Sequence, residues 1–489
     1  MFDGDLLSER ARVTPGKLAL VVVETGERLT YAQLDQRIDR AAATLRAHLQ
    51  PGDRFGLLAY NCVEFIELFF AAGRAGAIVV PLSTRATAHE LEHIAADCGM
   101  KALLYGDEHA DIASALLSVV SCQLSVRHRE KAPLTDNRQP TTAVGNTPED
   151  TYCLLYTSGT TGKPKGVMIP KRQLLWNGYN TAINWGLRDD DVSPVFTPLY
   201  HAGGLAAFLV PIFCAGGTII LHKGFDTADV WRTIQDERCT VVLGVPTIWK
   251  LLMDAPEFPA ADLSHVRWFI SGGAPLPQHI IDAYQKRGVA FKQGYGMTEV
   301  GVNCFTMTVD DSFRKPGSIG KPMMFTEVKL ENMDGEPGEE IGEMWIRGPH
   351  VSKGYWNNDT ATREAYGEDG WFRTGDLARR DEEGFFYIAG RRKEMFISGG
   401  VNVYPAEIEA ELVSHPAVSD AAVVAVPDET WGEVGVAFVV GSASQEELAE
   451  YLGLRIAKYK VPRRFVFIDT LPRTAYGKVV KEELRRQLS

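Results

Sequence analysis

The string YTSGTTGKPKGV, Tyr156–Val167, gathers hydroxyl-bearing residues, glycines and lysines into one short stretch. Hydroxyls, ammonium groups and the backbone N–H groups that glycines expose are the donors that a phosphate needs. A plain surface turn is the alternative. A Walker A loop requires GxxxxGK followed by Ser or Thr, but here Gly159 and Gly162 are too close and Pro164 follows Lys163. The string therefore predicts a phosphate-binding loop of a different kind.

Further short blocks after this loop combine glycines with one chemically useful group. In chain order they are PLYHAGGL with His201, SGGAPLP at Ser271–Pro277, GYGMTE at Gly294–Glu299, WFRTGDL with Asp376, GRRKEMFISGGVNVYPAEIE from Gly390, and PRTAYGK up to Lys478. Each block alone has an ordinary explanation, such as a turn-capping aspartate or a solvated lysine. In composition and order, however, the set resembles the adenylate-forming enzymes, the superfamily of acyl-CoA synthetases, firefly-type luciferases and nonribosomal-peptide adenylation domains.

The resemblance implies a two-step reaction that joins a carboxylic acid first to AMP and then to a thiol. The first step brings a carboxylate to the anionic α-phosphate of ATP, so cations and a metal ion are expected there. ATP, Mg²⁺ and CoA are the implied cofactors and co-substrates. The implied catalytic residues are Lys478 between α-phosphate and carboxylate, Thr298 on the α-phosphate, Glu299 as the Mg²⁺ ligand, and His201.

The same resemblance implies a nucleotide site. The glycine-rich loop would hold the β- and γ-phosphates, Tyr295 would stack on adenine, and Asp376 would accept the ribose hydroxyls beside Arg391. The full set implied for ATP and AMP is Thr157, Ser158, Gly159, Thr160, Thr161, Gly162, Lys163, Lys165, Gly273, Ala274, Tyr295, Gly296, Asp376 and Arg391.

For the second step, the resemblance implies a C-terminal domain that swings about a hinge at Lys393. Lys478 would leave the site, and Ser398, Gly399 and Gly400 would form a channel for the pantetheine arm. Glycines suit such a channel because they place no side chain in its path. Trp431 matches a position that touches CoA in some relatives.

The residues near the motifs favour an acid with an apolar tail. Around the PLYHAGGL block and the GYGMTE block stand Trp185, Tyr200, Phe208, Val300 and Val302. No acidic residue stands beside the histidine to hold an ammonium group, which argues against an amino acid. We therefore expect an acyl-CoA synthetase for a fatty or aromatic acid. The alternatives are a stand-alone enzyme that loads a carrier protein, and a non-catalytic nucleotide-binding regulator.

Helical and strand patterns alternate over most of the chain, as expected for parallel sheets covered by helices. With 489 residues, two or more domains are expected. We predict an α/β fold: a large N-terminal domain, 1–390, of α/β subdomains with a small β-rich unit after about residue 310, and a small, mobile α+β C-terminal domain, 391–489.

Composition excludes several classes of protein. The net charge of −12 argues against a nucleic-acid partner. Seven dispersed cysteines form no CxxC pair, and the N-terminus shows no secretory pattern, so we expect the reducing cytoplasm. The uncharged stretch Gly203–Leu221 is broken by Pro211 and Gly216-Gly217, which predicts a short buried helix and a strand rather than an integral membrane segment. Whether the chain forms a homo-oligomer is left open.

Overall fold

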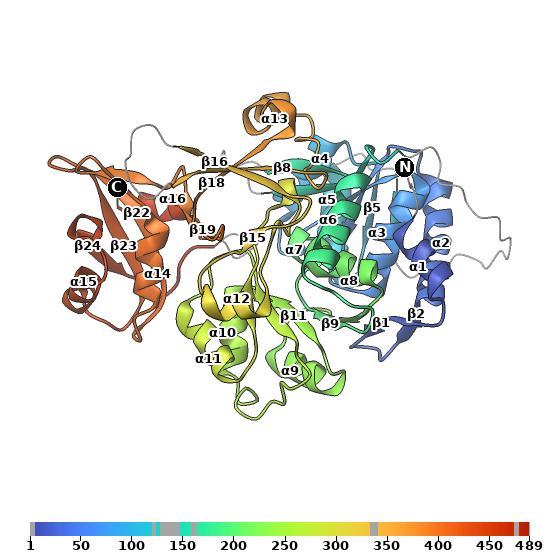
Figure 1. Ribbon diagram of the computed structural model, residues 1–489. Helices are drawn as coiled ribbons and strands as arrows, with labels where there is room; N and C mark the ends of the chain where they lie inside the picture. The colour runs from blue at the N-terminus through green and yellow to red at the C-terminus, as the bar shows by residue number, and fades with distance from the viewer. Residues whose placement is uncertain are drawn as a thin grey trace.

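The computed structural model describes residues 5–119, 124–127, 147–157, 164–332, 341–473 and 479–488. In Figure 1 the α/β layers, coloured blue to green, lie on the side of the N-terminus, and the C-terminal part, orange to red, lies at the opposite end. The predicted α/β class is confirmed, with a large N-terminal part, a β-rich unit and a small C-terminal part.

A six-stranded sheet has the order β6-β5-β3-β4-β7-β8. Neighbouring strands are parallel except β7 and β8. The strands are β3 (Arg54–Leu58), β4 (Ile78–Pro81), β5 (Ala102–Tyr105), β6 (Leu124–Arg127), β7 (Thr151–Thr157) and β8 (Lys165–Pro170). β4 reads IVVP with all four residues buried, the unbroken apolar run of a parallel strand covered on both faces.

Helices connect these strands and extend beyond the last one: α3 (Val63–Ala75), α4 (Ala88–Cys98), α5 (Ala110–Val119) and α6 (Lys171–Asn184), with the short η1 (Asp107–His109). Local sequence sets their ends. Thr87 and Glu90 form a capping box before α4, and Gly99 ends that helix in the left-handed conformation with φ 59°.

A second sheet, ordered β2-β1-β10-β9, packs beside the first. Its elements are α1 (Leu6–Val13), β1 (Leu18–Val22), β2 (Arg28–Thr30), α2 (Tyr31–His48), β9 (Val192–Val195), α7 (Ala202–Gly204), η2 (Leu205–Leu209), α8 (Val210–Ala215) and β10 (Thr218–Leu221). One large apolar cluster includes residues of both sheets and of the helices between them. These two sheets therefore share a core.

The uncharged stretch forms a buried helical run followed by β10, as predicted, but Pro211 does not break the helix. Proline cannot donate to a carbonyl one turn earlier. The run instead passes through a π turn, η2. Two side-chain amides donate to carbonyl groups of this turn: Asn177 Nδ2 donates to Ala206 O at 2.7 Å, and Asn303 Nδ2 donates to Ala207 O at 2.9 Å. Side-chain donors thus replace the missing backbone bond.

A third, parallel sheet has the order β11-β12-β13. Its elements are α9 (Thr227–Asp236), β11 (Val241–Gly244), α10 (Pro246–Asp254), β12 (Trp268–Ser271), α11 (Gln278–Lys286) and β13 (Phe291–Gln293). Buried rings hold it together: Trp249 lies 4.9 Å from both Phe269 and Phe291, and Tyr284 lies 5.1 Å from Phe291, centroid to centroid. Such aromatic pairs stabilise beyond the area that they bury.

The β-rich unit follows. It contains η3 (Thr298–Val300), the paired β14 (Phe305–Thr306) and β15 (Lys321–Pro322), α12 (Val309–Arg314), and an antiparallel sheet of β16 (Glu327–Asn332), β17 (Gly342–Arg347), β18 (Phe372–Arg380) and β19 (Phe386–Arg391), with α13 (Asp359–Ala365) and η4 (Glu368–Gly370). Its last strand leads into the C-terminal part.

The C-terminal part forms a separate five-stranded sheet, in which β24 is parallel to β23 and the order of the others is β21-β20-β23-β22. Its elements are β20 (Phe396–Ser398), β21 (Val401–Val403), α14 (Pro405–Val413), β22 (Val418–Asp428), β23 (Gly432–Gly441), α15 (Gln445–Gly453), η5 (Lys458–Lys460), β24 (Arg464–Phe467) and α16 (Lys481–Arg486). Among the described residues, no helix is both long and apolar enough to cross a membrane.

Candidate active site

The third sheet brings two of the sequence blocks to one edge. Ser271 pairs with Gln293 at the carboxyl ends of β12 and β13, and Gly294 N donates to Ser271 O at 2.7 Å. The loop with Gly273 and Ala274 is exposed beside this point. Gly273 has φ +86°, a conformation that favours glycine. Ligands of α/β sheets bind at such carboxyl ends.

Gly296, in the next block, has no room for a side chain. An added Cβ would lie 2.3 Å from the carbonyl carbon and oxygen of Val302. The backbone of the GYGMTE block therefore lies directly against the segment that follows it. This contact fixes Tyr295 and Thr298 on either side of the glycine.

Asp376 is held by two of the predicted nucleotide residues. Tyr295 Oη donates to Asp376 Oδ2 at 2.5 Å, and Arg391 Nε lies 2.6 Å from Asp376 Oδ1. The antiparallel register of β18 and β19 places Asp376 opposite Arg391. Burial and the neighbouring carboxylate raise the pKa of Tyr295 well above its usual value, so its hydroxyl stays protonated and donates. The structure thus brings all three side chains together.

Glu299, the last residue of the GYGMTE block, contacts Tyr355, and the Tyr355 ring lies near Lys165 at the start of β8. Its carboxylate is buried and accepts a hydrogen bond from Tyr355 Oη at 3.0 Å. Lys165 Nζ lies 5.3 Å from the centroid of the same Tyr355 ring. Burial and the Glu299 charge raise the pKa of Tyr355, which keeps it a donor. Tyr355 is a site residue that the sequence blocks did not reveal.

The chemistry of Glu299 suits Mg²⁺. This cation prefers oxygen ligands and is commonly held by one or two carboxylates together with substrate phosphates and water. No group of three or more His, Cys, Asp or Glu side chains suited to a metal occurs among the described residues. A site with one protein carboxylate fits a metal that arrives with ATP.

The phosphate loop is described at its ends. Thr157, the last residue of β7, pairs with Lys165, the first of β8. The tip of the predicted loop, Ser158, Gly159, Thr160, Thr161, Gly162 and Lys163, lies outside the described residues, as does Lys478. The hairpin still fixes the position of both loop ends.

His201 caps the helical run that contains the π turn. Its Nδ1 accepts a hydrogen bond from Gly203 N at 3.1 Å, and its side chain is exposed. Ala202, the next residue, lines a cavity. The histidine therefore lies at the start of the segment that bounds this cavity.

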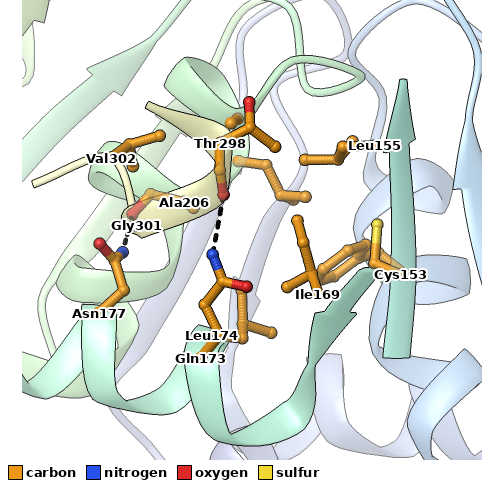
Figure 2. Close-up of a pocket in the computed structure, with 13 residues that line it drawn as sticks. Cys153, Leu155, Ile169, Gln173, Leu174, Asn177, Ala206, Thr298, Gly301 and Val302 are labelled. Carbon is orange, nitrogen blue, oxygen red and sulfur yellow. Dashed lines mark hydrogen bonds between the residues drawn. The ribbon is translucent and has the colours of Figure 1, made fainter. Parts of the chain in front are cut away.

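The cavity lies between α6, β7, β8, the 202–206 segment and the end of the GYGMTE block (Figure 2), and its empty space, partly open to solvent, is about 340 Å³. Its walls are mostly apolar, with Gln173, Asn177 and Thr298 as the polar members. The other lining residues are Phe69, Cys153, Leu155, Ile169, Leu174, Ala202, Leu205, Ala206, Gly301 and Val302.

Only part of the predicted apolar set lines this cavity. Val302 does, but Trp185, Tyr200, Phe208 and Val300 are buried elsewhere in the core. Trp185 packs 6.0 Å from Phe208, and its Nε1 donates to Phe305 O at 3.1 Å. Of the five predicted pocket residues only Val302 lines this cavity, because packing decides which side of each segment faces it.

The residues predicted for the second step lie beyond the last strand of the β-rich unit. Lys393 is exposed in the turn between β19 and β20, which belong to different sheets. Ser398 is buried, whereas Gly399 and Gly400 are exposed with φ +60° and +82°. Trp431 covers Gly399: Gly399 N donates to Trp431 O at 2.9 Å, and a Cβ on Gly399 would lie 2.7 Å from the indole.

Arg463 lies beside Trp431, with its guanidinium 5.5 Å from the Trp431 ring centroid. A cation beside an exposed aromatic ring and the open Gly400 is a combination suited to a large, phosphorylated thiol. The expected channel residues and Trp431 therefore lie close together at the end of β20.

Known proteins are similar to this chain over nearly its whole length. A family model described as AMP-binding enzyme matches residues 7–356, and one described as AMP-binding enzyme C-terminal domain matches residues 407–478. A feruloyl-CoA synthase from Amycolatopsis sp is 42% identical over 486 residues, covering 98% of this chain and 97% of that protein. The long-chain-fatty-acid–CoA ligase FadD13 of Mycobacterium tuberculosis is 38% identical over 510 residues, covering 99% and 98%.

A solved structure is similar over the same extent. O-succinylbenzoate coenzyme A synthetase (MenE) from Bacillus subtilis, in complex with ATP and magnesium ion, has a TM-score of 0.87 and is 33% identical, covering 98% of this chain and 99% of that one. The N-terminal and C-terminal parts of this chain thus resemble the corresponding parts of that structure.

Proposed function

This chain belongs to the AMP-binding enzyme family, and from that premise we propose that it activates an aromatic carboxylic acid and transfers it to coenzyme A. It is an AMP-forming acid–thiol ligase, and ATP, Mg²⁺ and CoA are its co-substrates and cofactor. One relative acts on ferulate and another on long-chain fatty acids. The observation that carries the aromatic proposal is the lining of the cavity beside Thr298, because its walls are mainly apolar, include the Phe69 ring and carry only a few polar groups, as sites for small apolar ligands do.

In the first step, a carboxylate oxygen of the acid attacks the α-phosphorus of ATP. The bond to the β-phosphate breaks, and pyrophosphate leaves with the electron pair. We assign Lys165 and the loop after Thr157 to the β- and γ-phosphates, Thr298 to the α-phosphate and Asp376 to the ribose hydroxyls. The buried hydrogen bonds of Asp376 and Glu299 support these roles, because preorganised groups need not reorient during reaction.

Glu299 would hold Mg²⁺ in this step. Bound there, the ion would neutralise phosphate charge as a Lewis acid. Tyr355 would keep the carboxylate in place through its 3.0 Å hydrogen bond. Lys165, beside the same ring, would add a cation on the phosphate side.

In the second step, the CoA sulfur attacks the acyl carbonyl carbon. The bond to the AMP oxygen breaks, AMP leaves, and the thiol proton passes to solvent. We propose that residues 391–489 turn about Lys393 between the steps, withdrawing Lys478 and bringing Gly399 and Gly400 to the acyl end. The position of Lys393 between two sheets and the open surroundings of Gly400 support this movement.

The test is incubation of the purified chain with ATP, Mg²⁺, CoA and a panel of straight-chain and aromatic acids. Acyl-CoA and AMP forming together, fastest with aromatic acids, is the expected result by mass spectrometry. A preference for long straight chains would overturn the aromatic proposal. Accumulation of acyl-AMP without acyl-CoA would instead favour a carrier-protein thiol, and absence of AMP with every acid would favour a regulator.

We also propose that the chain works in the cytoplasm and that it forms a homo-oligomer. Light scattering would test the second of these proposals. The described cysteines carry free thiols, and five of them are buried, which suits a reducing compartment. Fractionation of the native host, with activity appearing outside the cytoplasmic fraction, would contradict the location.

A further inference from the structure

The turn between β19 and β20 is held to the β-rich unit on its first side. Arg392 Nη1 lies 2.5 Å from Glu343 Oε2 on β17, and Arg392 N donates to Gly375 O on β18 at 2.9 Å. The Glu343 side chain is buried, so its carboxylate has a fixed position in that sheet. The residue before Lys393 is therefore anchored to the N-terminal part.

On its second side, the turn is held to the C-terminal part. Glu394 Oε2 lies 2.6 Å from Lys481 Nζ at the start of α16. The same ammonium group lies 2.7 Å from Glu409 Oε1 on α14, and this oxygen accepts a hydrogen bond from Val423 N on β22 at 2.7 Å. Two helices and a strand of the C-terminal part therefore fix the partner of Glu394.

Lys393 lies between these two anchors, and its side chain is exposed. Two backbone hydrogen bonds cross it: Glu394 N and Met395 N donate to Arg391 O at 3.0 and 3.1 Å. A rotation at Lys393 would open both of these bonds. It would leave the two anchors intact, because each anchor joins groups within one part of the chain.

We propose that Arg392 and Glu394 are positioning residues that confine the movement between the two reaction steps to Lys393. This inference rests on the proposed function, which includes that movement, and deepens it. Each anchor keeps the backbone beside it fixed to its own part, so that one residue absorbs the change in dihedral angles. The moving part then starts at Glu394, and it has one defined orientation in each step.

Either anchor can be removed without leaving its partner unpaired. In Glu394→Ala, the Lys481 ammonium keeps its second carboxylate at 2.7 Å. In Arg392→Ala, the Glu343 carboxylate keeps Arg373 Nη2 at 3.6 Å. Breaking a buried ion pair is costly mainly when the remaining charge is left alone. Both variants should therefore fold with nearly the stability of the wild type, as measured by urea unfolding.

The direct test is the distance between spin labels placed at Glu382 and Glu446. Both positions are exposed, one in a turn of the β-rich unit and one on α15. The wild type should give one narrow distance with ATP and Mg²⁺ and a different narrow distance with AMP and CoA. In Glu394→Ala and in Arg392→Ala, both distance distributions should broaden, because the backbone beside Lys393 is no longer fixed.

Turnover should fall together with this broadening. The freedom of one backbone residue corresponds to a factor of about five to thirty in the population of a single arrangement. We expect kcat for acyl-CoA formation to fall by about that factor in each variant. The matched control is Glu407→Ala, because Glu407 forms a partly buried ion pair with Lys460 at 2.8 Å inside the C-terminal part. It should keep the narrow distances and the turnover of the wild type.

Glu394→Gln distinguishes an anchor from a general effect of shortening the side chain. Its amide oxygen can still accept a hydrogen bond from Lys481 Nζ. The distance distributions of this variant should therefore be close to those of the wild type. Distributions as broad as those of Glu394→Ala, or equal broadening in Glu407→Ala, would contradict the inference.

The outcomes separate the two proposals. If the wild type gives the same distance with both sets of ligands, the movement in the proposed function fails. If the wild-type distance changes but Glu394→Ala and Arg392→Ala keep narrow distributions, the inference alone fails, and packing outside the turn fixes the orientation of the C-terminal part.

Discussion

At the residue scale, the hydroxyl of Tyr295 is expected to affect both the stability of the fold and the proposed binding of ATP. It donates to the buried Asp376 at 2.5 Å. Hydrogen bonds to charged groups contribute about 1.5–3 kcal/mol. We expect Tyr295→Phe to lower the free energy of unfolding by that amount and to raise the KM for ATP, as measured by urea denaturation and pyrophosphate release. Tyr387→Phe is the control, because its hydroxyl lies 3.4 Å from the more exposed Asp381 and should contribute little.

Lys292 is a second residue whose effect can be predicted, this time through pH. It is buried on β13 with Nζ 4.8 Å from the Trp268 ring centroid. Burial and the nearby Arg267 charge lower the pKa of Lys292 from 10.5 to about 8. The unfolded chain therefore binds more protons between these two values, and this group makes stability rise with pH across the window, by up to about 1.4 kcal/mol per pH unit.

Lys292→Met should remove that dependence. The difference in unfolding free energy, wild type minus variant, should increase from pH 8 to pH 10.5 and stay flat below pH 7. Subtracting the variant cancels the other groups that titrate in this range. A flat difference across the whole range would show that the lysine keeps its ordinary pKa in the folded chain.

At the scale of elements, the carbonyl groups of the π turn depend on side-chain donors, and this dependence can be tested. Asn303→Ala would leave Ala207 O without its amide donor, a loss of about 1–3 kcal/mol for a buried acceptor. Pro211→Ala restores a backbone N–H one turn later, so the same substitution should cost less in that background. Urea unfolding of the two single variants and the double variant measures this coupling; equal costs in both backgrounds would contradict it.

Elements also show what the sequence could predict. Alternating patterns and the glycine-rich blocks were sufficient for the α/β class and the family. The register that sets Asp376 opposite Arg391 was not readable, because pairing depends on the hairpin between them. Gln173 and Tyr355 carry no local signal; only three-dimensional packing brings each beside a motif residue.

At the scale of the whole molecule, the proposed rotation separates the two half-reactions. Lys478→Ala should slow adenylation by about a hundredfold or more, the loss typical of one electrostatic stabiliser, and leave thioester formation from supplied acyl-AMP far less affected. Rapid-quench assays of each step would measure this. Equal losses in both steps would contradict the rotation.

Gly400→Phe should have the opposite effect and impair mainly thioester formation. The matched control is Gly384→Phe, since Gly384 has nearly the same backbone angle, φ +85° against +82°, and equally open surroundings in a turn of the β-rich unit. Both variants bear the same local strain. A selective adenylation defect in Gly400→Phe would contradict the channel assignment.

Arg391 links Asp376, the carboxylate that we propose for the ribose, to the turn at Lys393. Its side chain pairs with Asp376, and its carbonyl accepts from Glu394 N and Met395 N at 3.0 and 3.1 Å, which closes that turn. One residue thus contacts both the carboxylate proposed for the ribose and the proposed hinge. AMP should therefore stay bound until the C-terminal part turns back, so an ordered release is expected in which acyl-CoA departs first. Added AMP should then compete with ATP, and a noncompetitive pattern would show that the nucleotide leaves earlier.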